Sequence, residues 1–321
     1  VEDKKSHLGI GGKAKNLVHL EEIGAKVPSW AVVPEEVLLK QLAQELGVDQ
    51  IQDAFNKLLV PQDIIAQLQL FFGENFESTT YAVRSSAIDE DGAQFSFAGQ
   101  FETYLHVSHD EIEEKIKAIW LSAVSPRVIK YRQQNNLPLQ FGIGVMIQEM
   151  ISSEAAGVAF GAYPLTGDPS IKIVSAVFGL GEGLVSGDLD ADTFTISEQG
   201  IKSQVVSKPH QYVRDTVNGG IEKTETNASI KDTPSLSEQQ VYEISTLLDQ
   251  LNQKLGKAQD LEFAFSKGIL YLLQTRPITT VEKFQKGEYT LWDNSNIIES
   301  YPGITTPLTF TFIIKMYEMV Y

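Results

Sequence analysis

Short β-prone segments broken by glycines fill the middle of this 321-residue chain and restrict its fold more than any other feature. From Phe141 to Ser197 the chain contains GIGVMIQEMI, AAGVAFGAYP, SIKIVSAVFGLGEG and ADTFTIS. Apolar runs of this length, bounded by turn residues, are typical of strands. We therefore expect an antiparallel sheet with functional loops in the C-terminal part of an α+β fold.

A second β signal follows in DLEFAFSKGILYLLQTRP, which predicts a hairpin with its turn at Ser266-Lys267-Gly268. Along its second strand Gln274 and Arg276 share one face, and Glu262 on the facing strand can lie beside Gln274. A carboxylate, an amide oxygen and a guanidinium on one face suit Mg²⁺ and phosphate together. An ordinary surface trio is the alternative interpretation.

Helical segments surround these strands. AKNLVHLEEIG predicts a helix closed by Gly24, and VPSWAVVP predicts a strand before the helix EEVLLKQLAQELG. Residues 50–72 have a helical pattern that Pro61 interrupts.

Capping patterns mark three further helices. Ser108 with Glu111 fits a capping box, and Ser125-Pro126 places proline at the first position of the next helix. Ser237 with Gln240 predicts a helix that ends near Gly256, whereas the polar residues 218–236 predict an exposed excursion.

Arg84 ends the apolar run YAVR and precedes SSAIDEDGAQFSFAGQF. Burying an arginine without an anionic partner costs several kcal/mol, about the free energy of a strong ion pair. The partner is either one of the acidic residues Asp89, Glu90 and Asp91 or a nucleotide phosphate. Those three carboxylates would repel a phosphate unless they face water, a lysine or magnesium.

Two glycine clusters resemble familiar phosphate motifs but fail their spacing rules. GIGGKAKN lacks the P-loop pattern, since His7 stands where a glycine is needed and Ala14 follows Lys13. Gly179, Gly181 and Gly183 do not have the dinucleotide spacing, and no clear parallel βαβ unit surrounds them. Each cluster alone is more typical of a tight turn.

Composition sets the remaining limits. A hydrophobic content of 42% can support a substantial core, in one domain or two. The net charge of −16 argues against a non-specific nucleic-acid binder, and the absence of cysteine excludes disulfides and thiolate metal sites. We expect a cytoplasmic protein, because a chain without cysteine is easiest to reconcile with a reducing cytosol. No apolar run approaches the length of a membrane span. VEDKKSHLGI has no signal-peptide pattern and no initiator Met, which suggests a trimmed chain.

The chain resembles the ATP-binding domain of the phosphoenolpyruvate synthase, pyruvate phosphate dikinase and rifampin phosphotransferase family. The order and approximate spacing of five motifs agree, over nearly the whole chain up to about Pro277. These motifs are Gly11-Gly12-Lys13 with Asn16-Leu17, AVRSSA at 82–87, FAGQ at 97–100 through Thr103, FGLGE at 178–182, and QTRP at 274–277.

The resemblance implies an ATP-grasp fold, in which two α+β subdomains clamp ATP with Mg²⁺, and it assigns roles to individual residues. Lys13 and Arg84 would neutralise phosphate charge, and Gly99 and Thr103 would line a loop that covers the phosphates. Gln148 would lie at the adenine and hinge region. Roles for three residues of the hairpin also follow: metal binding by Glu262 and Gln274, and stabilisation of charge during transfer by Arg276.

The resemblance also implies a reaction. The β-phosphate of ATP would pass to a histidine on a separate swivelling domain, with AMP released, and then to an acceptor. None of the five histidines, His7, His19, His106, His109 and His210, has the Gly-rich Thr-His-Ala setting of such a carrier. We therefore expect the carrier and acceptor domains elsewhere in the parent protein, and we do not expect the isolated chain to complete the reaction.

For the domains, we expect a nucleotide-binding domain over residues 1–280 with a subdomain break roughly near 105 to 140. Residues 281–321 are expected to be a linker and the start of a following domain. Three functions stay open: the ATP-binding module of a phosphoenolpyruvate synthase-like dikinase, that of a rifampin-type antibiotic phosphotransferase, and a nucleotide-binding regulatory module.

Overall fold

The computed structural model describes residues 11–42, 58–86, 102–134 and 142–278. Gly99, the acidic run 89–91 and the predicted linker 281–321 lie outside these residues. Within them, the predicted α+β class is confirmed, because helices cover antiparallel sheets.

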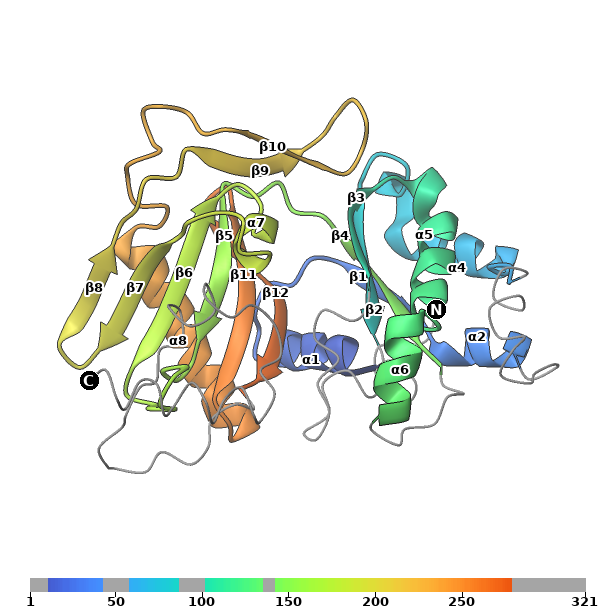
Figure 1. The fold of residues 1–321 in the computed structure, drawn as a ribbon, viewed down its shortest axis with the longest axis horizontal. Helices are drawn as coiled ribbons and strands as arrows, with labels where there is room; N and C mark the ends of the chain where they lie inside the picture. Colours follow the sequence, from blue (N-terminus) through green and yellow to red (C-terminus); the bar gives the residue numbers. More distant parts are fainter. Residues whose placement is uncertain (1–10, 43–57, 87–101, 135–141, 279–321) are drawn as a thin grey trace, which may run out of the picture. The chain divides into compact units, whose positions relative to one another are not determined.

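The first sheet has four strands in the order β1-β4-β2-β3, and every neighbouring pair is antiparallel (Figure 1). Its strands are β1 (Trp30–Val33), β2 (Tyr81–Ser86), β3 (Thr103–Val107) and β4 (Gly144–Glu149). The inward faces of these strands are apolar and buried, so the sheet forms one wall of a core.

Several helices complete the core of the first sheet. They are α2 (Glu35–Leu42), α4 (Gln62–Phe72) with the 3₁₀ turn η2 (Gly73–Asn75), η3 (His109–Glu111) leading into α5 (Ile112–Ser122), and α6 (Pro126–Gln134). The predicted interruption at Pro61 is confirmed, because Pro61 directly precedes α4. The capping box is also present: Glu111 accepts hydrogen bonds from the backbone N–H and hydroxyl of Ser108 at 3.0 and 2.7 Å.

The second sheet has six antiparallel strands in the order β12-β11-β5-β6-β7-β8. They are β5 (Ala155–Phe160), β6 (Lys172–Phe178), β7 (Asp192–Ser197), β8 (Gly200–Gln204), β11 (Gln259–Ser266) and β12 (Ile269–Pro277). The sheet expected over residues 141–197 is confirmed in part: β5, β6 and β7 lie here, whereas the first predicted segment, GIGVMIQEMI, forms β4 of the first sheet. The turn of its last hairpin uses Lys267 and Gly268, both at positive φ, which is the twist a two-residue turn requires.

Helices α1 (Gly11–Glu22) and α8 (Glu238–Leu255) pack against the second sheet in a continuous apolar core. Both end as predicted: Gly24 follows α1 at φ 79°, and Gly256 is a left-handed cap of α8. Ser237 and Gln240 form the predicted capping box, which satisfies two free N–H groups at the start of α8.

The predicted excursion over residues 218–236 is partly wrong, because it contains strand β10 (Ile221–Glu225). This strand pairs with β9 (His210–Arg214) in a two-stranded ribbon, and Gly219 and Gly220 provide the positive-φ turn between the two strands. Thr226, Ser235 and Leu236 at the end of the segment are buried. Polarity misled the prediction, since an exposed ribbon carries polar side chains as a loop does.

The described strands on either side of the expected subdomain break, roughly near 105 to 140, both belong to the first sheet. The physical reason is strand β4, which comes after this region in the chain but pairs between β1 and β2. The chain passes from the first sheet to the second between Glu149 and Ala155.

Candidate functional site

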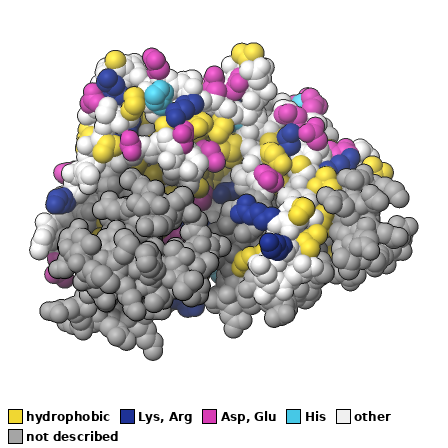
Figure 2. Space-filling model, in the orientation of Figure 1, with side chains coloured by type: hydrophobic (Ala, Val, Ile, Leu, Met, Phe, Trp, Pro, Cys, Tyr) yellow, Lys and Arg dark blue, Asp and Glu magenta, His cyan; other side chains and the backbone are white. Residues whose placement is uncertain are grey.

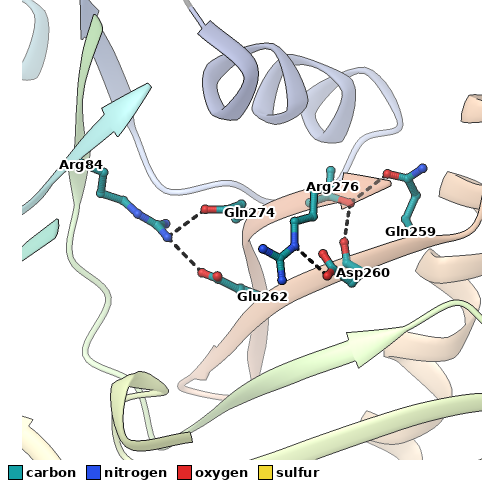
Figure 3. Close-up of polar contacts among 7 residues, drawn as sticks. Arg84, Gln259, Asp260, Glu262, Gln274 and Arg276 are labelled. Carbon is teal, nitrogen blue, oxygen red and sulfur yellow. Dashed lines mark hydrogen bonds and ion pairs between the residues drawn. The ribbon is translucent and has the colours of Figure 1, made fainter. Parts of the chain in front are cut away.

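Arg84 on β2 reaches from the first sheet to the last hairpin of the second sheet. Its Nη2 donates hydrogen bonds to Glu262 Oε2 at 3.1 Å and to Gln274 Oε1 at 2.8 Å (Figure 3). The side chain of Arg84 is 13% exposed and that of Glu262 is 29% exposed, so the pair is partly shielded from water. The sequence left the partner of Arg84 open between the acidic run and a phosphate, and the partner found here is a carboxylate 178 residues further along the chain.

The hairpin places Glu262 directly opposite Gln274, which confirms the predicted register. A β-bulge follows at once: Phe263 pairs with Leu272, so Leu273 is the extra residue on β12. Bulges turn side chains at the edges of binding sites, and Leu273 lines the pocket described below. The pairing of β11 with β12 therefore fixes the positions of the two residues whose oxygens bond to Arg84.

Arg276 lies one pair further along the same face, opposite Asp260. Its Nε donates to Asp260 Oδ2 at 2.7 Å, and its side chain is 47% exposed (Figure 3). The predicted shared face of Gln274 and Arg276 is thus present. The guanidinium of Arg276 is bound to a carboxylate that the sequence-based prediction did not assign to the site.

A pocket of about 720 Å³, part of it open to solvent, lies beside the Arg84–Glu262 pair. It is lined from the first sheet by Ala82, Arg84, Thr103, Leu105 and Gln148, and from the second by Ala156, Gly157, Glu262, Phe263 and Leu273, among others. Four predicted site residues therefore share one cavity: Arg84, Thr103, Gln148 and Glu262.

Gln148 forms part of the pocket wall from near the end of β4. It is 2% exposed, yet its Nε2 has no hydrogen-bond partner among the described atoms. Most buried polar groups in folded proteins are hydrogen-bonded, so an unpaired amide in a cavity wall indicates a place for a polar ligand or water. Thr103 lies opposite Arg84 across the β2–β3 pair.

Lys13 lies on α1 near the end of β2, where its Nζ donates to Ser85 Oγ at 3.2 Å. The glycines before it explain this closeness. Gly11 has φ 73°, and a Cβ at this position would lie 2.0 Å from the carbonyl oxygen of Ser86. Only glycine fits there, so Gly11 allows the start of α1 to lie close to β2. Lys13 thereby contacts Ser85, the residue that follows Arg84.

Glu182 is the pocket residue to which the sequence-based prediction gave no role, although it belongs to the FGLGE motif. It begins the short helix α7 (Glu182–Val185) and lines the pocket. Burial raises the pKa of its carboxyl group, the nearby Glu262 carboxylate raises this pKa further, and Arg84 partly opposes both effects. A carboxylate directly after a glycine-rich turn was the signal that could have identified it.

The loop that carries Glu182 is held by the β9–β10 ribbon. Gly179 forms a bridge to Tyr212, and a Cβ at Gly179 would meet the Tyr212 carbonyl oxygen at 2.4 Å. Tyr212 and Lys223 both bond to Asp188 beyond α7, at 2.9 and 2.7 Å. The ribbon therefore fixes one rim of the pocket.

Two antiparallel sheets thus line a common pocket, and the Arg84 guanidinium beside it is bonded to the side-chain oxygens of Glu262 and Gln274. A model of the family described as "Pyruvate phosphate dikinase, AMP/ATP-binding domain" matches residues 8–293. The chain belongs to this family of AMP/ATP-binding domains. Its mixed helices and antiparallel sheets agree with the α+β part of the predicted fold class.

Curated relatives include three proteins of different description. The chain is 33% identical over 315 residues to a probable phosphoenolpyruvate synthase of Archaeoglobus fulgidus, covering 88% of this chain and 41% of that protein. It is 32% identical over 298 residues to a rifampicin phosphotransferase of Bacillus cereus, covering 85% and 34%. It is 31% identical over 328 residues to a prodigiosin synthesizing transferase of Serratia marcescens, covering 94% and 37%. The chain thus spans well under half of each relative.

Among solved structures, a D-alanine–D-alanine ligase of Helicobacter pylori is similar to 85% of this chain and 56% of its own, at 9% identity and a TM-score of 0.36.

Within the described part of the chain, no helix combines the length and the apolar character needed to cross a membrane. Figure 2 shows acidic side chains spread among basic and apolar ones over the upper part of the visible face.

Proposed function

We propose that this chain binds ATP with Mg²⁺ and that its parent protein is a phosphoenolpyruvate synthase-like dikinase. In this reaction the β-phosphate of ATP passes to a histidine on a separate swivelling domain, AMP is released, and the phosphate moves on to an acceptor. One observation supports the proposal most strongly: Glu262 and Gln274 direct their oxygens to a single cationic nitrogen beside the pocket.

The donor set fits a magnesium ion. Mg²⁺ prefers oxygen ligands and is usually bound by one or two protein side chains together with phosphate oxygens. Glu262 Oε2 and Gln274 Oε1 both converge on Arg84 Nη2, which supports a cation position between the two oxygens. These two residues would hold the metal, which would neutralise phosphate charge during transfer.

Cationic groups on two elements would bind the phosphates. Arg84 lines the pocket, and Lys13 lies next to the end of β2 through its bond to Ser85. Thr103, opposite Arg84, would contact the phosphates from the start of β3. We propose the same role for Gly99, which lies outside the described residues.

Gln148 would recognise the base. Its Nε2 is buried without a hydrogen-bond partner among the described atoms, Gln148 lines the pocket, and adenine presents ring nitrogens that accept hydrogen bonds. Pairing with the ligand would satisfy a polar group that is otherwise costly to bury.

Arg276 would stabilise the charge that develops during transfer. Its half-exposed side chain lies two residue pairs beyond Gln274 on β12 and is held by Asp260. Arg276→Ala should therefore leave folding and nucleotide affinity largely intact and block phosphotransfer in the parent protein, since a group that acts in the transition state affects turnover more than binding. Unchanged turnover would reject this role.

Calorimetry with the chain tests nucleotide binding directly. Titration with an unreactive ATP analogue should give measurable binding with Mg²⁺ and much weaker binding when a chelator removes the metal. Arg84→Ala should lower the affinity for the analogue, because the substitution removes a charge that binds phosphate. No heat with Mg²⁺ present would overturn the proposal.

A rifampin-type phosphotransferase is the second candidate, favoured by the relative from Bacillus cereus at 32% identity. The two candidates share the ATP site and differ in the acceptor. In the parent protein, AMP release that depends on pyruvate would support the first and release that depends on rifampicin would support the second. A nucleotide-binding regulatory module would bind ATP and release no AMP with either.

A further inference from the structure

Arg84 is bound to the same two oxygens that we propose as metal ligands. A single nitrogen, Nη2, makes both contacts, while Nε of the same guanidinium is buried and has no hydrogen-bond partner among the described atoms. Both hydrogen bonds to the pair therefore come from a single nitrogen of the guanidinium. Its remaining hydrogen-bonding capacity is not satisfied there.

A metal ion and Arg84 cannot use this oxygen pair together. Mg²⁺ binds its oxygen ligands at about 2.1 Å, closer than the 2.8 and 3.1 Å of the two hydrogen bonds. A cation in contact with both oxygens would take the position of Nη2 and repel the guanidinium at short range. A metal bound at this position would therefore displace Nη2 from Glu262 Oε2 and Gln274 Oε1.

We propose that Arg84 is an exchangeable counter-ion of the Glu262–Gln274 pair, displaced when the metal–nucleotide complex arrives and transferred to the nucleotide phosphates. This inference rests on the proposed function of the site. Free metal offers Arg84 no new partner and must compete with it, whereas a metal–triphosphate complex supplies an anion at the same time. The exchange thus makes the site selective for the complex over the free metal.

The surrounding charges strengthen this coupling. Glu182 lies close enough to Glu262 and Arg84 to interact with both electrostatically. With Arg84 held on Glu262, this acidic wall is partly neutralised. A triphosphate that approached without metal would meet two carboxylates, while the metal-bearing complex brings its own positive charge.

Calorimetric titration with Mn²⁺ alone tests the exchange without nucleotide or turnover. Arg84→Met should bind Mn²⁺ about tenfold or more tightly than the unsubstituted chain, because the hydrogen bonds to a charged group that the metal must break are gone. The matched control is Lys13→Met, which removes one positive charge near the end of β2 and leaves the Arg84 bonds in place. Its Mn²⁺ affinity should change less than about threefold.

Two results would overturn the exchange: no gain in Arg84→Met, or an equal gain in Lys13→Met, which would indicate a general charge effect. The double variant Arg84→Met/Glu262→Gln should lose the gain, which places the bound metal at this pair. Circular dichroism checks folding, and Arg84→Gln serves as the alternative if the Met variant does not fold.

Failure of the exchange and failure of the proposed function give different patterns. If the unsubstituted chain binds the Mg²⁺–ATP analogue and Arg84→Met shows no gain for Mn²⁺, only the exchange is wrong. If the analogue does not bind at all, the proposed function is wrong. The Mn²⁺ series then shows whether Arg84 competes with a metal ion that binds without nucleotide.

Discussion

Two ion pairs in this chain have similar chemistry and opposite surroundings. Lys208 and Asp192 pair at 2.7 Å with side chains 1% and 0% exposed, whereas Arg84 and Glu262 pair at 3.1 Å with side chains 13% and 29% exposed. Asp192 also accepts hydrogen bonds from the backbone N–H groups of Val206 and Ser235. Lys208 donates a further bond to the Val206 carbonyl oxygen at 2.7 Å.

The difference separates a structural ion pair from one that a ligand can use. Opening the Lys208–Asp192 pair would leave two fully buried charges without compensation and release the chain on both sides of the β9–β10 ribbon. Opening the Arg84–Glu262 pair exposes groups that already border a cavity, and one nitrogen of Arg84 has no partner to lose. We expect substitutions in the first pair to affect stability and those in the second to affect binding.

The largest expected effect is on stability, from Asp192→Ala. The substitution leaves the Lys208 ammonium buried without its carboxylate and removes acceptors from two backbone N–H groups, so the free energy of unfolding should fall by about 3–5 kcal/mol. Urea denaturation followed by circular dichroism measures this. The control is Asp249→Ala, which breaks the pair between Lys172 and the 65%-exposed Asp249 and should cost less than about 1 kcal/mol. Equal losses would remove the distinction.

His106 is a second buried polar residue, and its contribution to stability can be measured through its pH dependence. It is 7% exposed, bonds through Nδ1 to Thr80 Oγ1 at 2.8 Å, and has its pKa lowered to about 4 by burial and secondarily by Arg214. The folded state therefore binds fewer protons than the unfolded state between about pH 4 and 6.5, so stability falls as the pH drops through this range.

His106→Asn should remove this part of the pH dependence. Asparagine tolerates the left-handed backbone of this position, where φ is 52°. The loss of stability between pH 7 and pH 4 should be smaller in the variant by about 2–3 kcal/mol. Parallel urea denaturation at the two pH values gives the difference. Identical losses in both chains would show that His106 is not held neutral by its surroundings.

The contrast between the two pairs also shows what the sequence could and could not predict. Local patterns predicted the hairpin, its turn and the opposition of Glu262 and Gln274, because register follows from turn geometry and the period of two. They could not predict that Arg84 would bond to that hairpin or that Lys208 would meet Asp192, since both contacts depend on tertiary packing. The position of β4 was missed for the same reason: strand order is not encoded in local periodicity.

Glu262→Gln tests the pocket side of the comparison. The amide cannot supply the charge that a metal and Arg84 both require, so affinity for the Mg²⁺–ATP analogue should fall by about tenfold to a hundredfold. The free energy of unfolding without ligand should change by less than about 1 kcal/mol, because the lost pair is partly exposed. Calorimetry and urea denaturation give the two values. Glu222→Gln on the exposed face of β10 is the control, and a large stability loss with unchanged affinity would reverse our assignment.

The smallest expected effect comes from Glu182→Gln, which sharpens the comparison because it should stabilise the chain. Burial and the Glu262 carboxylate raise the pKa of Glu182, so the folded state binds its proton more tightly than the unfolded state does. The Glu182 carboxyl group therefore makes stability fall as the pH rises above the ordinary carboxyl pKa. The neutral amide avoids this cost, and at pH 7 the variant should be more stable by less than about 1 kcal/mol.

That gain should disappear at low pH, where Glu182 is protonated in both states, and Glu198→Gln at an exposed position should show no gain at either pH. Thermal denaturation at pH 7 and pH 4 gives the comparison. A destabilised Glu182→Gln at pH 7 would mean that the carboxylate is compensated in the folded chain. The charges of the pocket would then resemble the Lys208–Asp192 pair, because each would be stabilised by a partner within the folded chain before any ligand binds.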